Sequence, residues 1–116
     1  MIYKEKFSLI ERKKETEYVL NKYPDKIPII CEKDIKASND TPIIDKNKYL
    51  IPFDLTVGQF VYIIRKRLKI TQEKAIYLFI QNMIPPTSAL LFDIYSHLKD
   101  EDGFLYITYS AENTFG

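Results

Sequence analysis

The sequence predicts an α+β fold of the β-grasp type, in which a four-stranded mixed sheet packs against a central helix and one or two helices precede the sheet. Strand-like and helix-like segments follow one another in the order β, β, α, β, α, β after a charged helical start. The 116 residues suffice for one small domain with a single core. Hydrophobic residues at 46% and charged residues at 28% are typical of a globular protein.

The first 22 residues are expected to form a helical extension of the domain. Residues 3–22 are charged, with apolar side chains such as Ile10, Val19 and Leu20 at helical spacing. The helical part should end before Tyr23, because a residue that precedes proline avoids the α conformation. We therefore predict an extension over 1–22 and a β-grasp domain over 23–110.

Two strands are expected next, over 26–33 and 46–53, joined by the polar loop 34–45. Pro52 cannot donate a ladder hydrogen bond, so we expect Pro52 to lie at a strand end or on a sheet edge. Alternation puts Ile27, Ile29 and Cys31 on one face of the first strand, and Pro28, Ile30 and Glu32 on the other; in the second strand, Lys48, Leu50 and Pro52 oppose Tyr49, Ile51 and Phe53.

The second half of the chain begins with a well-marked helix. Thr56 and Gln59 have the spacing of a capping box, which predicts a helix over 57–68. The remaining elements are expected to be a strand over 75–80, a turn with an N-cap at 85–88, a helix to about 98, a turn over 100–103, a strand over 104–110 and a flexible tail over 111–116.

Composition excludes several function classes. Seventeen Lys and Arg against sixteen Asp and Glu give a net charge of +1, which disfavours a protein that binds duplex nucleic acid. No apolar run approaches the roughly 20 residues that span a bilayer, and the charged N-terminus has no secretory signal, so a cytosolic or nuclear location is expected. Three glycines are too few for the usual phosphate-binding loops, and neither a metal site nor a cofactor is expected.

Nucleophilic catalysis is also disfavoured. Cys31 is the only cysteine and lies in a segment that predicts a buried strand, whereas a reactive thiolate needs an accessible, electropositive site. His97, the only histidine, lies near the end of the last predicted helix and is interpreted as a surface residue. We therefore expect that the protein is not an enzyme.

The helix predicted over 57–68 carries more apolar side chains than one interface needs. Val57, Val61, Ile64 and Leu68 form a stripe that suffices to dock it on a sheet, and Phe60 and Ile63 lie beside that stripe. Two interpretations remain open. The extra face belongs to the core, capped by the N-terminal helices, or it lines a groove for an external apolar side chain.

The second strand has the features of a guarded sheet edge. It is apolar on both faces, ends in proline and is flanked by Lys46 and Lys48. Lysines protect edge strands from aggregation, and the same edge can accept a peptide as an added strand. Such a site would favour an extended apolar peptide with acidic neighbours, although the lysines could serve solubility alone.

Five segments and the terminus resemble the autophagy ubiquitin-like modifiers, the family of the GABA-A-receptor-associated protein and the microtubule-associated light chain three proteins. The strongest is KYLIPFDLTVGQF at 48–60. The others are KYPDKIPII at 22–30, IRKR at 64–67, IPPTSA at 84–89, FLYITYS at 104–110 and the terminal Phe115-Gly116. The resemblance covers nearly the whole chain and implies a ubiquitin-like β-grasp fold with two added N-terminal helices.

The resemblance also implies a function. In this family the terminal glycine, here Gly116, passes from an activating to a conjugating enzyme and is joined to phosphatidylethanolamine; many members are trimmed by a cysteine protease. The membrane-bound protein then recruits cargo receptors through an aromatic-x-x-aliphatic motif. By this resemblance the protein is expected to be a monomer, cytoplasmic before lipidation and on the autophagosomal membrane afterwards.

The resemblance assigns residues to two peptide pockets and a rim. The first pocket, for the aromatic side chain, would be lined by Glu15, Val19, Pro28, Ile30, Lys48, Leu50 and Phe104. The second, for the aliphatic side chain, would be lined by Tyr49, Ile51, Pro52, Leu55, Phe60 and Ile63. The charged rim would comprise Lys26, Lys46 and Arg67.

The chain departs from the family pattern at several positions. Lys26 replaces a frequent arginine, which turns a bidentate clamp into a point charge. Phe53 replaces a small polar residue, and the loop 34–45 is about two residues longer. Two rival functions remain: an adaptor that uses the pockets without lipidation, and a nucleic-acid binder that uses Lys4, Lys6, Arg12, Lys13, Lys14 and the tyrosines.

Overall fold

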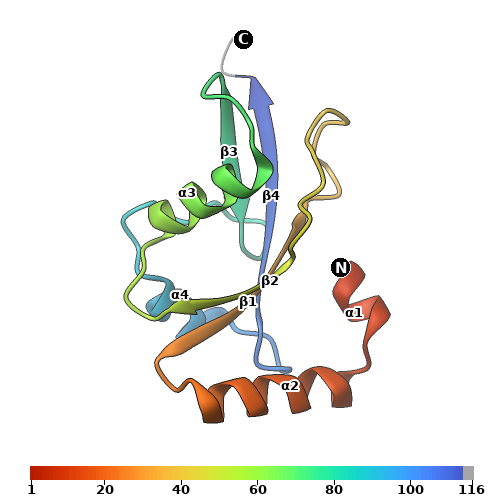
Figure 1. The fold of residues 1–116 in the computed structure, drawn as a ribbon, viewed down its shortest axis with the longest axis vertical. Coiled ribbons are helices and arrows are strands. Elements are labelled where there is room, and N and C mark those ends of the chain that lie inside the picture. Colours follow the sequence, from red (N-terminus) through yellow and green to blue (C-terminus); the bar gives the residue numbers. More distant parts are fainter. Residues whose placement is uncertain (114–116) are drawn as a thin grey trace.

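The computed structural model describes residues 1–113 and consists of four helices and one four-stranded sheet within that range (Figure 1). The helices are α1 (Ile2–Lys6), α2 (Leu9–Lys22), α3 (Val57–Leu68) and α4 (Leu91–Leu98). The strands are β1 (Lys26–Lys33), β2 (Lys48–Pro52), β3 (Lys74–Phe79) and β4 (Leu105–Asn113).

The sheet has the order β2-β1-β4-β3, which makes β2 and β3 its two edges. The central strands β1 and β4 run parallel, and each pairs with its outer neighbour in the antiparallel sense. The predicted β-grasp fold with a mixed sheet and two N-terminal helices is therefore confirmed.

The two faces of the sheet are covered by different helices. Ile27, Ile29 and Cys31 of β1 belong to the main core, together with side chains of α3 and α4. The alternate residue Ile30 packs on the other face with Tyr3 of α1 and with Phe104. Figure 1 shows the same division, with α3 and α4 on one side of the sheet and α1 and α2 on the other. The alternation predicted for β1 is thus confirmed.

The apolar surplus on α3 belongs to the main core. Phe60 is fully buried and meets the ring of Tyr49 edge to face, with centroids 5.5 Å apart. Val61 and Ile63 are partly buried against the same core. The core interpretation is therefore right for Phe60, but the expected cap is wrong, because the N-terminal helices cover the opposite face.

Several element bounds differ from those expected. The capping box of Thr56 and Gln59 is present and α3 has the predicted bounds. By contrast, α4 begins at Leu91 with no side-chain cap, later than the turn 85–88 suggested. The backbone of that turn and of the next residue bonds to α3 instead: Gly58 N donates to Thr87 O and Val57 N to Ala89 O.

The last strand extends beyond the predicted end at Ser110. Backbone pairing with β3 continues through Ala111, Glu112 and Asn113. Those three residues, expected in the flexible tail, therefore lie in β4. Gly116 lies outside the described residues.

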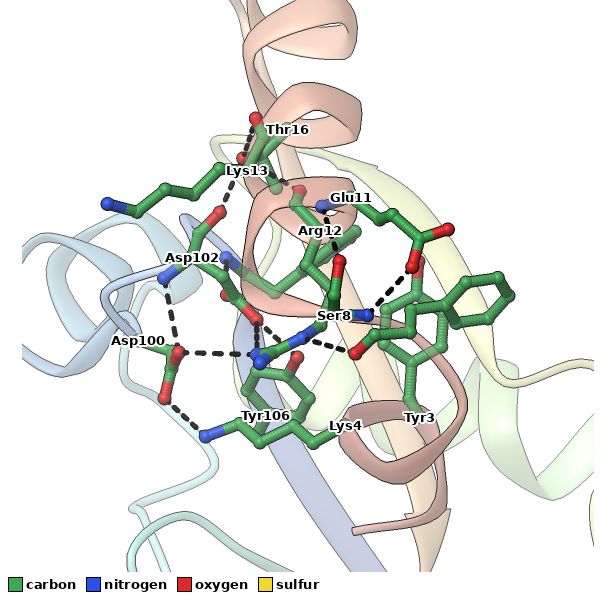
Figure 2. A network of polar contacts seen from close by, with 12 residues as sticks. Tyr3, Lys4, Ser8, Glu11, Arg12, Lys13, Thr16, Asp100, Asp102 and Tyr106 are labelled. Carbon is green, nitrogen blue, oxygen red and sulfur yellow. Dashed lines mark hydrogen bonds and ion pairs between the residues drawn. The ribbon is translucent and has the colours of Figure 1, made fainter.

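Polar contacts fix the N-terminal helices to the turn that precedes β4 (Figure 2). The carboxylate of Asp102 is buried and accepts hydrogen bonds from Arg12 Nη1 at 2.6 Å and Tyr106 OH at 2.5 Å. Thr16 Oγ1 donates to the backbone oxygen of Asp102 at 2.5 Å. Lys4 adds an ion pair with Asp100. Helix α2 is thereby held in one position beside the sheet.

Candidate functional site: the exposed edge of strand β2

Strand β2 presents one free edge, because only its other side pairs with β1. Unpaired backbone groups on a sheet edge can accept a further strand. Leu50 lies opposite Pro28 in the register and shares the face that α2 covers, whereas Tyr49 and Ile51 point into the main core. The edge therefore has a different set of side chains on each side.

A cavity of about 170 Å³ lies on the α2 side of this edge. Its lining includes six of the seven residues expected for the first pocket: Glu15, Val19, Pro28, Lys48, Leu50 and Phe104. Lys46 and Tyr49 complete it. The seventh expected residue, Ile30, is fully buried against Phe104 and Tyr3 and does not line the cavity.

Hydrogen bonds fix the carboxylate of Glu15 at the edge of this cavity. Lys48 Nζ donates to one oxygen, and Tyr3 OH donates to the other at 2.5 Å. Partial burial alone would raise the pKa of Glu15, but the hydrogen bonds from Lys48 and Tyr3 outweigh it and hold that pKa below its ordinary value. Glu15 is therefore a charged acceptor beside an otherwise apolar pocket.

The residues expected for the second pocket lie together on the α3 side of β2, but half of them are buried. Tyr49, Ile51 and Phe60 are core residues, with Phe60 at 0% exposure. Leu55 and Ile63 are partly buried against them, and Pro52 is half-buried at the end of β2. As this surface stands, Leu55, Ile63 and Pro52 are the side chains that an incoming group can reach.

Tyr49 connects the two regions. Its hydroxyl is buried and has no hydrogen-bond partner in the part of the chain that the structure describes. Burial raises the pKa of this phenol, so it stays protonated. Lys46 Nζ lies 5.2 Å from the centroid of its ring.

The three rim cations occupy different positions around the edge. Arg67 Nε donates to Asp45 Oδ1 at 2.8 Å, and both side chains remain largely exposed. Such an exposed pair is weak and can exchange partners. Lys26 lies opposite Pro52 in the register, at the other end of the edge from Lys46.

Neither Cys31 nor His97 lines the cavity beside β2. Cys31 is buried as predicted, and burial raises the pKa of its thiol, which makes it inert. His97 is exposed on α4, with Nδ1 2.8 Å from the Asp93 backbone oxygen.

No helix within residues 1–113 is long and apolar enough to cross a membrane.

Two features of the site were not predicted from the sequence. Tyr3 contributes both to the packing under Phe104 and to the position of Glu15. Asp102 anchors α2, although 90 positions separate it from Arg12. The hydrophobic spacing of the N-terminal segment indicates helices but not the partners of their polar side chains.

A β-grasp sheet that carries two N-terminal helices places this chain among the ubiquitin-like proteins with a helical N-terminal extension. Comparison with known proteins shows to which family of them the chain belongs. Residues 11–116 match the family model described as "Autophagy protein Atg8 ubiquitin like". The chain belongs to the Atg8 family and is an autophagy ubiquitin-like protein.

Sequence relatives are similar over almost their full lengths. Autophagy-related protein 8 of Schizosaccharomyces pombe is 60% identical over 114 residues, which cover 98% of this chain and 93% of that protein. The Aspergillus niger protein of the same name is 58% identical, with 98% and 95% covered.

Solved structures agree. ATG8 of Trypanosoma brucei superposes with a TM-score of 0.90 at 45% identity, covering 98% of this chain and 97% of that one. Plasmodium falciparum Atg8, in complex with a P. falciparum Atg3 peptide, gives a TM-score of 0.84 at 34% identity, with 95% and 98% covered.

Proposed function

We propose that this protein is a ubiquitin-like modifier that is conjugated through Gly116 to phosphatidylethanolamine and that recruits cargo receptors and autophagy proteins by adding their aromatic-x-x-aliphatic motifs to β2. It is a substrate of conjugation and not itself an enzyme. Before lipidation it is cytoplasmic, and afterwards it is held on autophagosomal membranes.

One observation carries the docking half of this proposal. Side chains three positions apart on an extended peptide point to opposite faces of the sheet that the peptide joins. Here the cavity beside Leu50 and the apolar surface at Leu55 and Ile63 lie on opposite faces, on either side of the free β2 edge. A spacing of two intervening residues therefore suits this edge.

The order of the two regions along β2 also sets the direction of the peptide. The first cavity centres on Lys48 and Leu50, whereas the second region centres on Ile51, Pro52 and Leu55. Because the aromatic residue precedes the aliphatic one in the motif, the peptide would run parallel to β2.

The energetics are compatible with reversible recruitment. Burying an aromatic side chain of 150–250 Å² at about 25 cal/mol/Å² contributes roughly 4–6 kcal/mol before costs. Ordering a flexible peptide offsets part of this gain. With the second anchor and the strand pairing, a micromolar dissociation constant is the expected order, equivalent to about −8 kcal/mol.

The docking half is tested by calorimetry with an acidic peptide that contains Trp-x-x-Leu. Leu50→Ala should weaken binding at least tenfold, because Leu50 lines the first cavity without belonging to the main core. Ile35→Ala, at a residue 97% exposed in the loop that precedes β2, is the matched control and should leave the affinity unchanged. Unchanged affinity in folded Leu50→Ala would overturn the assignment. Phe60 is unsuitable for this test, because truncating a fully buried phenylalanine would destabilise the fold.

The conjugation half is supported by family membership, because the match to the family model extends to Gly116. Glycine has no Cβ, so its carboxyl group can enter a narrow enzyme cleft. Attachment to a two-chain lipid would hold the protein on a membrane without a spanning helix. The Atg3 peptide bound by the P. falciparum relative supports binding of conjugation machinery by this chain too. Activating and conjugating enzymes, a deconjugating cysteine protease and cargo receptors are the proposed partners, with the protein itself monomeric and without affinity for nucleic acid.

The conjugation half is tested by incubation with activating and conjugating enzymes, ATP and phosphatidylethanolamine liposomes. A lipid adduct should form on the intact protein and disappear when Gly116 is deleted, while peptide affinity is retained in the deletion variant. If the intact protein gives no Gly116-dependent adduct, the unconjugated adaptor becomes the better account.

A further inference from the structure

An exposed aromatic pair lies just beyond the end of β2 and outside the peptide site described above. The rings of Phe53 and Phe92 meet edge to face, with centroids 6.1 Å apart and an interplanar angle of 82°. Phe53 is 49% exposed and Phe92 is 48% exposed. Together with Leu90, at 41% exposure, they form what we term the Phe53–Phe92 patch.

The backbone makes this patch continuous with the second pocket region. Thr56 and Leu90 form an antiparallel bridge, and Leu91 N donates to Leu55 O at 2.9 Å. Those contacts hold the start of α4 against the residues that follow Pro52. The patch therefore begins where the proposed peptide path along β2 ends.

The charges around the docking edge differ between its two ends. Lys46 and Lys48 flank the beginning of the edge, where residues before the aromatic anchor would lie. Asp54 and Asp93 adjoin the two phenylalanines in sequence and are exposed, and the backbone of Asp25 accepts a hydrogen bond from Phe53 N. Within residues 1–113, none of these three carboxylates forms an ion pair. Lys26, at the same end, belongs with Pro28 to the opposite face of the sheet.

We infer that the Phe53–Phe92 patch is an extension of the peptide site that binds a large apolar side chain, followed by Lys or Arg, downstream of the aliphatic anchor in the same peptide. This inference rests on the proposed docking function and specifies its ligand class. A peptide that runs parallel to β2 leaves the edge beyond Pro52, and at 3.3 Å per residue its next roughly two to four residues can reach the patch.

The patch would then act as a specificity determinant. Apolar contact with two half-exposed rings removes their remaining surface from water, and the carboxylates of Asp54 and Asp93 favour a cation at the rim. A ligand with acidic residues before the motif would match the lysines at the beginning of the edge. An apolar residue and a basic residue after the motif would match the patch and its carboxylates. Ligands that end at the aliphatic anchor would use the two pockets alone.

The test compares three peptides by calorimetry with the full chain. The first ends after an acidic Trp-x-x-Leu motif, the second adds a segment with Leu and Lys, and the third adds Ser at both positions. We expect the Leu–Lys peptide to bind about fivefold more tightly than the Ser–Ser peptide, equivalent to about 1 kcal/mol. In Phe53→Ser and Phe92→Ser that gain should fall below about twofold, while the short peptide binds as it does to the wild type.

Tyr77→Ser is the matched control, because Tyr77 is a 40% exposed aromatic residue on β3, at the opposite edge of the sheet. It should preserve the full gain. The inference is overturned if the wild type shows no gain, or if both serine variants retain it while the short peptide still binds. If the short peptide fails to bind the wild type, the docking function itself fails and the extension falls with it.

A second measurement needs no variant and so does not depend on the folding of one. A nitroxide label placed next to the downstream Leu of the bound peptide should broaden the aromatic NMR signals of Phe53 and Phe92 in the wild-type protein and leave those of Tyr77 sharp. Sharp signals from both phenylalanines with the peptide bound would contradict the proposal.

Discussion

Glu15 holds its charge because two donors surround it. Tyr3 OH and Lys48 Nζ each bond to one of its oxygens, and its pKa is lowered although partial burial opposes this. A carboxyl group whose pKa is lower in the folded state than in the unfolded state stabilises the protein above the unfolded pKa. That contribution is lost as the pH falls through the folded pKa.

Glu15→Gln therefore gives a pH-dependent effect with a defined sign. The variant should have a lower free energy of unfolding than the wild type at pH 7, and the difference should shrink as the pH falls from the ordinary glutamate pKa of about 4.3 through the lower pKa of the folded state. Since the Glu15 side chain is 32% exposed, the effect should be modest. Urea titrations at several pH values measure it, and a difference that grows toward low pH would contradict the assigned contacts.

At the scale of elements, α2 is positioned by polar contacts as well as by packing. Thr16 lies against the turn before β4, where Gly103 adopts a φ of 94° and a Cβ would come within 2.6 Å of Thr16 Oγ1. The close approach allowed by glycine lets Asp102 receive Arg12 and Tyr106 while buried. Since α2 forms one wall of the first pocket, this junction also shapes the peptide site.

Asp102→Asn should destabilise the protein by about 2 kcal/mol, because it removes a buried carboxylate that bonds to a guanidinium and a phenol. Denaturant unfolding measures the change. Glu101→Gln, at the adjacent exposed position, is the matched control and should change stability by less than about 0.5 kcal/mol. A shift in Asp102→Asn as small as that of the control would show that α2 docks through its apolar contacts alone.

The sequence predicts local elements better than their junctions. The capping box fixes the start of α3, and alternation assigns the faces of β1, because both signals depend on neighbouring residues. The start of α4 was misplaced, because the turn 85–88 bonds to distant α3 and its apparent caps are not used. Ala111–Asn113 lack strand periodicity and become a strand through pairing with β3.

For the whole molecule, one sheet separates two apolar regions, and its β2 edge lies between them. The main core with α3 fills one face, and the cluster of Tyr3, Ile30 and Phe104 fills the other. The residues that the family resemblance assigns to the two pockets come from distant parts of the sequence, and the fold brings them to the two faces beside the β2 edge. Sequence reasoning did not show that Phe60 would be buried completely, since side chains at helical spacing do not reveal which of them the core encloses.

The most direct measurement of this account varies the spacing of the motif. If the peptide joins β2 as a strand and its anchors enter opposite faces, a peptide with Trp-x-x-Leu should bind at least tenfold more tightly than one with Trp-x-Leu, whose anchors point to the same face. Calorimetry on the wild-type protein, with both peptides at equal length and charge, measures the ratio. Equal affinities for the two spacings would contradict strand addition at β2.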